Sequence, residues 1–136
     1  MSTTCQSGLT EPEKKLIFWA SFLALFACSV GFTFRVMTMG NWGMEFGLDN
    51  QQVGQIFGAS LWPIAVTMIM FSLLVDKIGY KVSIYIAFAL QILSVILTVS
   101  ANNADTLWWG ACCAGLGHGV IEAVINPVCS SIYTKE

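Results

Sequence analysis

Three polar residues lie four positions apart in an otherwise apolar stretch near the end of the sequence. They are His118, Glu122 and Asn126. Residues with this spacing share one face of an α-helix, so a helix here carries a polar stripe. An ionisable group inside a long apolar helix is energetically expensive and usually serves proton transfer or solute binding. Glu122 is the leading candidate for proton transfer. A structural carboxyl, bonded to a neighbouring helix, is the alternative.

His118 and Asn126 flank this carboxylate. Imidazole titrates near neutral pH, so His118 could join Glu122 in a proton relay. A hydrogen-bonding packing role is the alternative for His118. Asn126 lies one turn further along and is a candidate for binding a solute or for holding the polar network together.

Arg35 is the remaining candidate, because it is a cation at the end of another long apolar run. It lies about 28 Å along a helix that begins near Leu16. From there the side chain either extends to the membrane interface or faces inward. An inward-facing Arg35 would bind an anionic or hydroxyl-bearing solute, or balance Glu122. The expected heights of the two residues differ by roughly 10–15 Å, so the sequence does not predict a direct ion pair.

The composition excludes several classes of protein. The chain has 136 residues, of which 56% are hydrophobic and 10% are charged. Soluble domains carry about 25% charged residues, so this chain has too little charge for a water-exposed surface. It contains no basic patch that predicts nucleic-acid binding and no glycine-rich phosphate loop. No nucleophile–base pair suggests an enzyme.

Nothing in the sequence predicts a cofactor or a metal site. The five cysteines form no CxxC pair and no His-x-Cys ligand set, so we interpret them as packing residues. They are Cys5, Cys28, Cys112, Cys113 and Cys129.

Four long apolar runs predict an all-α membrane protein with four transmembrane helices. A polar tail over residues 1–15 comes before a membrane domain over residues 16–136. The first run is longer than the apolar part of a signal peptide, so we assign it to a helix. The expected helices cover about 16–39, 52–75, 82–100 and 106–133.

Cations flank these helices on one side only. With four alternating helices, the tail, the second connection and the C-terminal end share that side, which the positive-inside rule makes cytoplasmic. The first and third connections have no cation. We therefore expect a multi-pass protein of the cell (inner) membrane with a cytoplasmic N-terminus. The five cations are Lys14, Lys15, Lys77, Lys81 and Lys135.

Two glycine pairs have the spacing that lets helices approach closely. Gly54 and Gly58 form one pair, and Gly115 and Gly119 form the other. The GxxxG pattern is typical of helix–helix contacts in membranes, so both pairs predict close packing.

The connection between the second and third helices resembles the signature loop of the major facilitator superfamily, whose pattern is Gly-x-Leu-x-Asp-Arg-x-Gly-Arg-Arg/Lys. Here the leading Gly is replaced by Ser72 and the first basic residue after the second Gly by Tyr80. The resemblance implies that this loop contributes gating contacts between helices of one half. The matching residues are Asp76, Lys77, Gly79 and Lys81.

The fourth helix carries a second resemblance. Its glycine-rich start and the Glu122-Ala123-x-x-Asn126-Pro127 segment are similar to a stretch of the fucose–proton symporter-like transporters. This resemblance implies an alternating-access transporter, of which the four helices form part of the N-terminal six-helix half. It also implies that Glu122 serves proton coupling. The symporters place an acid in the first helix as well, whereas this chain has Arg35 there.

The sequence thus predicts proton-coupled transport of a small polar solute, with a sugar as the leading candidate. The expected partners are the solute, protons, the lipid bilayer and the remaining helices of a full-length transporter, since we interpret the chain as an N-terminal fragment. Two alternatives stay open. One is a complete four-helix transporter that dimerises, although such transporters place their essential acid in the first helix. The other is a four-helix membrane scaffold that transports nothing.

Overall fold

The computed structural model describes residues 10–133, with side chains described as far as Ser130. The predictions made for Cys5 and Lys135 and for most of the N-terminal tail lie outside these residues. Within the described part, the chain forms four α-helices, which are α1 (Glu11–Glu45), α2 (Asn50–Ile78), α3 (Tyr80–Val99) and α4 (Ala104–Tyr133). Each is long and apolar enough to cross a membrane. The predicted fold class, an all-α membrane protein, is confirmed.

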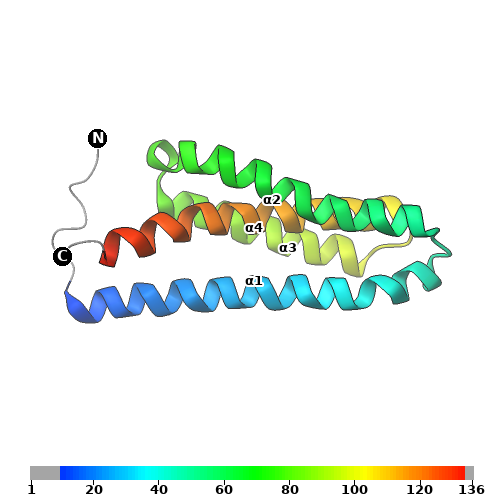
Figure 1. Ribbon diagram of the computed structural model, residues 1–136, viewed down its shortest axis with the longest axis horizontal. Helices are drawn as coiled ribbons and strands as arrows, with labels where there is room; N and C mark the ends of the chain where they lie inside the picture. The colour runs from blue at the N-terminus through cyan, green and yellow to red at the C-terminus, as the bar shows by residue number, and fades with distance from the viewer. Residues whose placement is uncertain (1–9, 134–136) are drawn as a thin grey trace.

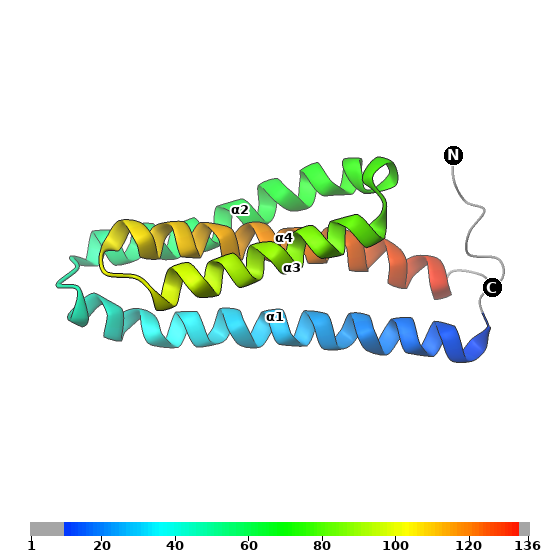
Figure 2. The ribbon, with the colours of Figure 1, turned by 180° about the vertical axis from the view of Figure 1, so that it is seen from behind.

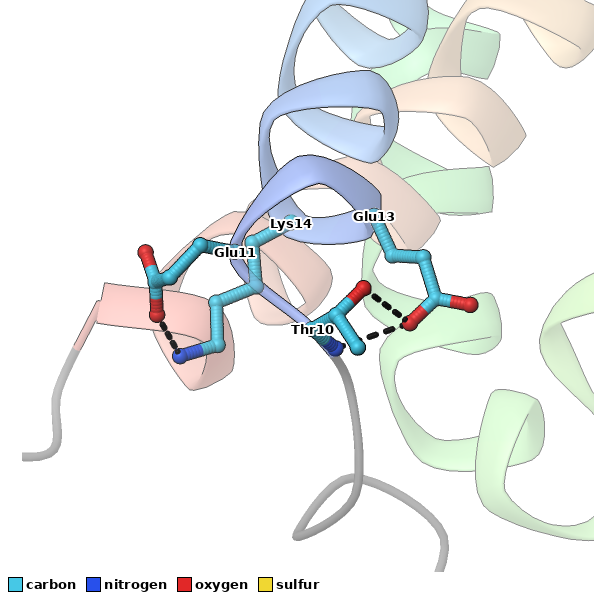
Figure 3. A network of polar contacts seen from close by, with 4 residues as sticks. All are labelled: Thr10, Glu11, Glu13 and Lys14. Carbon is cyan, nitrogen blue, oxygen red and sulfur yellow. Dashed lines mark hydrogen bonds and ion pairs between the residues drawn. The ribbon is translucent and has the colours of Figure 1, made fainter.

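The first helix begins at a polar cap that the sequence analysis assigned to the tail (Figure 3). The Glu13 carboxylate accepts hydrogen bonds from the backbone N–H and the hydroxyl of Thr10, both at 2.8 Å. Lys14 Nζ lies 2.6 Å from Glu11 Oε1. Pro12 fits the first turn, where no intrahelical N–H is required. These residues together start α1 several positions before the predicted boundary.

The far end of α1 also extends beyond its predicted limit. The helix continues through Gly40 and Gly43 to Glu45, beyond the end predicted near residue 39. Trp42 and Phe46 pack against a buried cluster around Met39, and this packing holds the last turns in helical form. Tertiary contacts here outweigh the low helix propensity of glycine.

The three connections are short and alternate between the two ends of the bundle (Figure 1). The start of α1, the α2–α3 connection and the end of α4 lie at one end, and the other two connections lie opposite. Gly79 forms the α2–α3 turn with a φ of +89°, a conformation that favours glycine. The Asn103 side chain accepts a hydrogen bond from the Thr106 N–H at 2.9 Å and so caps α4.

The fourth helix lies at the centre of the packing. It contacts α2 and α3 along most of its length, whereas α1 meets α4 and α2 over a smaller region. Both views show α1 running beside the other three helices, separated from much of their length (Figures 1 and 2). Met39 is the one buried residue of α1. The wide separation of α1 from α3 positions the site described next.

Candidate functional site

The predicted pair on α4 forms an actual contact. His118 Nε2 lies 3.3 Å from Glu122 Oε1, one helical turn away. The two side chains are 14% and 29% exposed, respectively. The Phe32 ring, from α1, meets the imidazole edge to face with ring centroids 6.3 Å apart. The pair therefore lies where α1 approaches α4, partly shielded and still in contact with solvent-accessible space.

Asn126 does not join this pair. It is exposed and does not line the cavity described below. Of the three residues predicted to form one polar stripe, two are therefore in contact and the third lies a turn beyond them. The role of Asn126 in solute binding stays a prediction.

A cavity of about 770 Å³ lies between α1, α3 and α4, with α2 contributing at one side. Small residues of α1, including Ala20, Ala24 and Gly31, form part of its wall. Most of the lining is hydrophobic, and His118 and Arg35 both reach it. The other side chains of the lining that can form hydrogen bonds are Ser21, Cys28, Trp42, Ser60, Gln91, Ser94 and Thr98.

Arg35 faces inward, which decides between the two orientations that the sequence left open. Its Nη1 donates to Thr98 Oγ1 at 3.1 Å, and its Nη2 donates to Ser94 Oγ at 2.8 Å. Ser94 Oγ in turn donates to the Gly110 carbonyl at 2.8 Å. This network ties α1 to α3 and α4. Arg35 does not pair with Glu122, whose carboxylate contacts His118 instead.

The α3 side of this network was missed by the sequence analysis. Gln91, Ser94 and Thr98 recur at three- and four-residue spacing in an apolar run, so they share one helix face. Gln91 Nε2 donates to the Ala114 carbonyl at 3.4 Å, which links α3 to α4 next to the cavity. This spacing was the available signal, and it is the same kind of polar stripe that the sequence analysis recognised on the fourth helix.

Ser60 is a second residue that the sequence did not single out. It is 1% exposed, lines the cavity, and its hydroxyl is the one buried side-chain polar atom without a hydrogen-bond partner in the described part of the chain. A Cβ placed on Gly115 would lie 2.5 Å from the Ser60 carbonyl oxygen. The close approach of α4 to α2 at this glycine therefore holds Ser60 in a tightly packed position.

The predicted gating residues lie around the α2–α3 turn. Asp76 and Lys77 are in the last turn of α2, and Lys81 is in the first turn of α3. All three side chains are exposed. Within residues 10–130, none of them forms an ion pair with another residue. Gly79 supplies the turn, and gating contacts for the charged residues stay a prediction.

The sequence matches a known protein family over most of its length. Residues 12–136 match the family model of the Major Facilitator Superfamily. The chain belongs to this superfamily. Neither a search of curated proteins nor one of solved structures finds a match.

Membership in the Major Facilitator Superfamily places the chain in a family of membrane transporters. Together with the four apolar helices, it identifies an integral, multi-pass membrane protein. The resemblance seen in the α2–α3 loop is thereby confirmed at the level of the superfamily. The finer likeness to fucose–proton symporters stays a prediction.

Among the residues that the structure describes, no three His, Cys, Asp or Glu side chains gather into a metal-binding group. Four cysteines are free thiols in or beside helix contacts: Cys28, Cys112, Cys113 and Cys129.

Proposed function

We propose that this member of the Major Facilitator Superfamily moves a small polar solute across the membrane, with a sugar as the leading candidate. Transport proceeds by alternating access and is coupled to proton movement at Glu122. The protein lies in the cell (inner) membrane, with its N-terminus on the cytoplasmic side. The His118–Glu122 contact carries the proposal, because it places two titratable groups 3.3 Å apart inside a membrane helix.

Three properties of the pair support proton coupling. First, a carboxylate within a membrane span is expensive and is typical of proton pathways. Second, the Glu122 side chain is 29% exposed, so it is not sealed off from proton exchange by the described residues. Third, His118 lines the cavity between α1, α3 and α4, so the pair lies beside the space in which a solute can bind. Protonation at the pair can therefore respond to a bound solute.

The complete gene product, reconstituted in liposomes with a pH-sensitive dye inside, tests this function. A panel of radiolabelled monosaccharides and their sugar acids is supplied outside. We expect one or more of them to enter together with protons. Glu122→Gln keeps the size of the side chain but cannot ionise, so it should uncouple uptake from proton flux and lower concentrative uptake about 100-fold or more.

Glu45→Gln is the matched control, since Glu45 is an exposed carboxylate at the end of α1, away from the cavity lining. It should leave both signals unchanged. Unaltered proton flux and uptake in Glu122→Gln would show that Glu122 is only a structural carboxyl.

A further inference from the structure

Arg35 donates hydrogen bonds to two hydroxyl oxygens, and each of these hydroxyls donates its own proton to a backbone carbonyl. A hydroxyl has one proton to donate. Ser94 Oγ gives its proton to the Gly110 carbonyl, and Thr98 Oγ1 gives its proton to the Ser94 carbonyl at 2.8 Å. Both oxygens therefore present lone pairs to the guanidinium. This arrangement fixes Arg35 in one orientation before any ligand binds.

The two hydroxyls satisfy hydrogen bonds but supply no negative charge. A guanidinium has five N–H donors, and the structure engages two of them. Among residues 10–130, no carboxylate oxygen lies within 4.0 Å of Arg35. Glu122, the carboxylate in the middle of α4, is paired with His118. Arg35 is thus a charged group within a membrane helix, held in one orientation and without a counter-ion in the described part of the chain.

We propose that Arg35 binds a carboxylate group of the transported solute, which is therefore an organic acid. The inference rests on the proposed transport function and names the class of its substrate. A carboxylate matches the planar fork of a guanidinium and can accept two parallel hydrogen bonds from it. Arg35 is the one Lys or Arg in the described lining of the cavity, so it balances one negative charge. Phosphate carries about −1.5 to −2 charges near neutral pH, which one guanidinium leaves partly uncompensated.

Ser60 narrows the class further. Ser60 lines the same cavity, and its buried hydroxyl has no partner among the described residues. A buried polar atom is normally hydrogen-bonded, so a polar group of the solute is a fitting partner. The solute then combines one carboxylate with at least one further polar group. Small hydroxy acids, including sugar acids, have this chemistry.

Matched pairs of probes separate charge from shape. Glucuronate is compared with glucose, and lactate with propane-1,2-diol, because each pair differs mainly in the carboxylate. Inorganic phosphate is the third anion. Binding is measured as the shift in thermal unfolding of the purified, complete gene product in detergent, and uptake is measured in proteoliposomes.

We expect at least one of the two acids to stabilise the wild-type protein, and its neutral partner and phosphate to have no effect. Arg35→Gln should weaken binding of that acid about 10- to 100-fold, as expected for loss of a charged hydrogen bond. Arg35→Lys should fall between the two, because it keeps the charge and loses the fork. Thr33→Ala is the control, since Thr33 is exposed on the same helix and bonds only to the Ser29 carbonyl.

The outcomes separate the inference from the proposed function. Binding of acids that depends on Arg35, without proton-linked uptake, supports the inference and contradicts the proposed function. Proton-linked uptake of a neutral sugar that is unaffected by Arg35→Gln overturns the inference and keeps the function. Stabilisation by phosphate alone, or equal responses of wild type and Arg35→Gln to every probe, also overturns it.

Discussion

Single hydroxyls on α3 determine how the cation of α1 is presented. Ser94 Oγ accepts from Arg35 and donates to the Gly110 carbonyl, so one atom joins three helices. Ser94 is itself 1% exposed. Hydrogen bonds of this kind within membranes contribute about 0.6 kcal/mol each on average, with larger values where a charge takes part. The role of Ser94 in stability is therefore modest, and its role in orienting Arg35 is the more important one.

Replacing Ser94 by alanine tests this division. We expect Ser94→Ala to lower the free energy of unfolding by about 0.6–2 kcal/mol, since two hydrogen bonds are lost and the Gly110 carbonyl is left without this donor. The measurement is reversible unfolding in mixed detergent micelles. Ser100→Ala is the matched control, because the exposed Ser100 hydroxyl bonds only to the Ile96 carbonyl of its own helix.

A double-mutant cycle with Arg35→Gln completes this experiment. The effects of Ser94→Ala and Arg35→Gln should be non-additive, because the two side chains share a hydrogen bond. Strictly additive effects would mean that Ser94 does not hold Arg35 in the membrane-embedded protein.

At the scale of residues, the sequence indicated which side chains are candidates for the site better than it indicated which residues they contact. His118 and Glu122 were predicted to share one helix face, because their spacing lies within one helix and helix periodicity fixes this local geometry. The partners of Arg35 lie about 60 positions away in sequence on α3. No periodicity within α1 indicates which helix faces it, so the inward orientation and the bonds to Ser94 and Thr98 could not be derived.

At the scale of helices, the two glycine pairs illustrate the same limit. Gly115 and Gly119 lie against α2, where an added Cβ would come within 2.5 Å of the Ser60 carbonyl oxygen and 2.6 Å of the Ile64 carbonyl oxygen. Gly54 and Gly58 have no atom within 4 Å of the position of an added Cβ among the described residues. The GxxxG spacing is identical in both pairs. The pattern therefore indicates that close packing is allowed, and the neighbouring helix decides whether it occurs.

This difference gives a prediction about α4. Gly115→Ala and Gly119→Ala should each destabilise the protein by about 1–3 kcal/mol, because the added methyl group meets rigid backbone and pushes α2 away. Gly54→Ala and Gly58→Ala add the same group in open space, and they should be neutral or stabilising by up to about 1 kcal/mol, since alanine favours helix. Thermal unfolding of the four variants in one detergent compares them directly. Equal effects at all four positions would contradict the packing of α4 on α2.

For the whole molecule, the number and order of helices followed from the lengths of the apolar runs, and the structure agrees with that order. The helix ends could not be predicted in the same way, because they depend on caps and on tertiary contacts. At one end of α1 the cap is formed by Thr10 and Glu13, and at the other end Trp42 and Phe46 pack against the buried cluster. The wide spacing of α1 from α3 was also not predictable. Composition identifies a membrane helix, but it does not show how closely two such helices pack.

The direction in which the molecule crosses the membrane is a prediction of its own. Lys14 and the cations of the α2–α3 turn lie at one end of the bundle, and the α1–α2 and α3–α4 connections contain no Lys or Arg. The cation-bearing end should face the cytoplasm, because translocation of Lys and Arg is disfavoured. Alkaline phosphatase, which folds only outside the cytoplasm, should be active when fused after Gly47 or Asn102 and inactive after Gly79. A green fluorescent protein fused at these sites should give the opposite pattern.

Replacing Lys77 and Lys81 with Gln should weaken the difference in reporter activity between the two ends of the bundle. Replacing Gln51 and Gln52 with Asn, as a control, should leave that difference unchanged. Phosphatase activity after Gly79 in the unmodified chain would mean that the orientation is reversed.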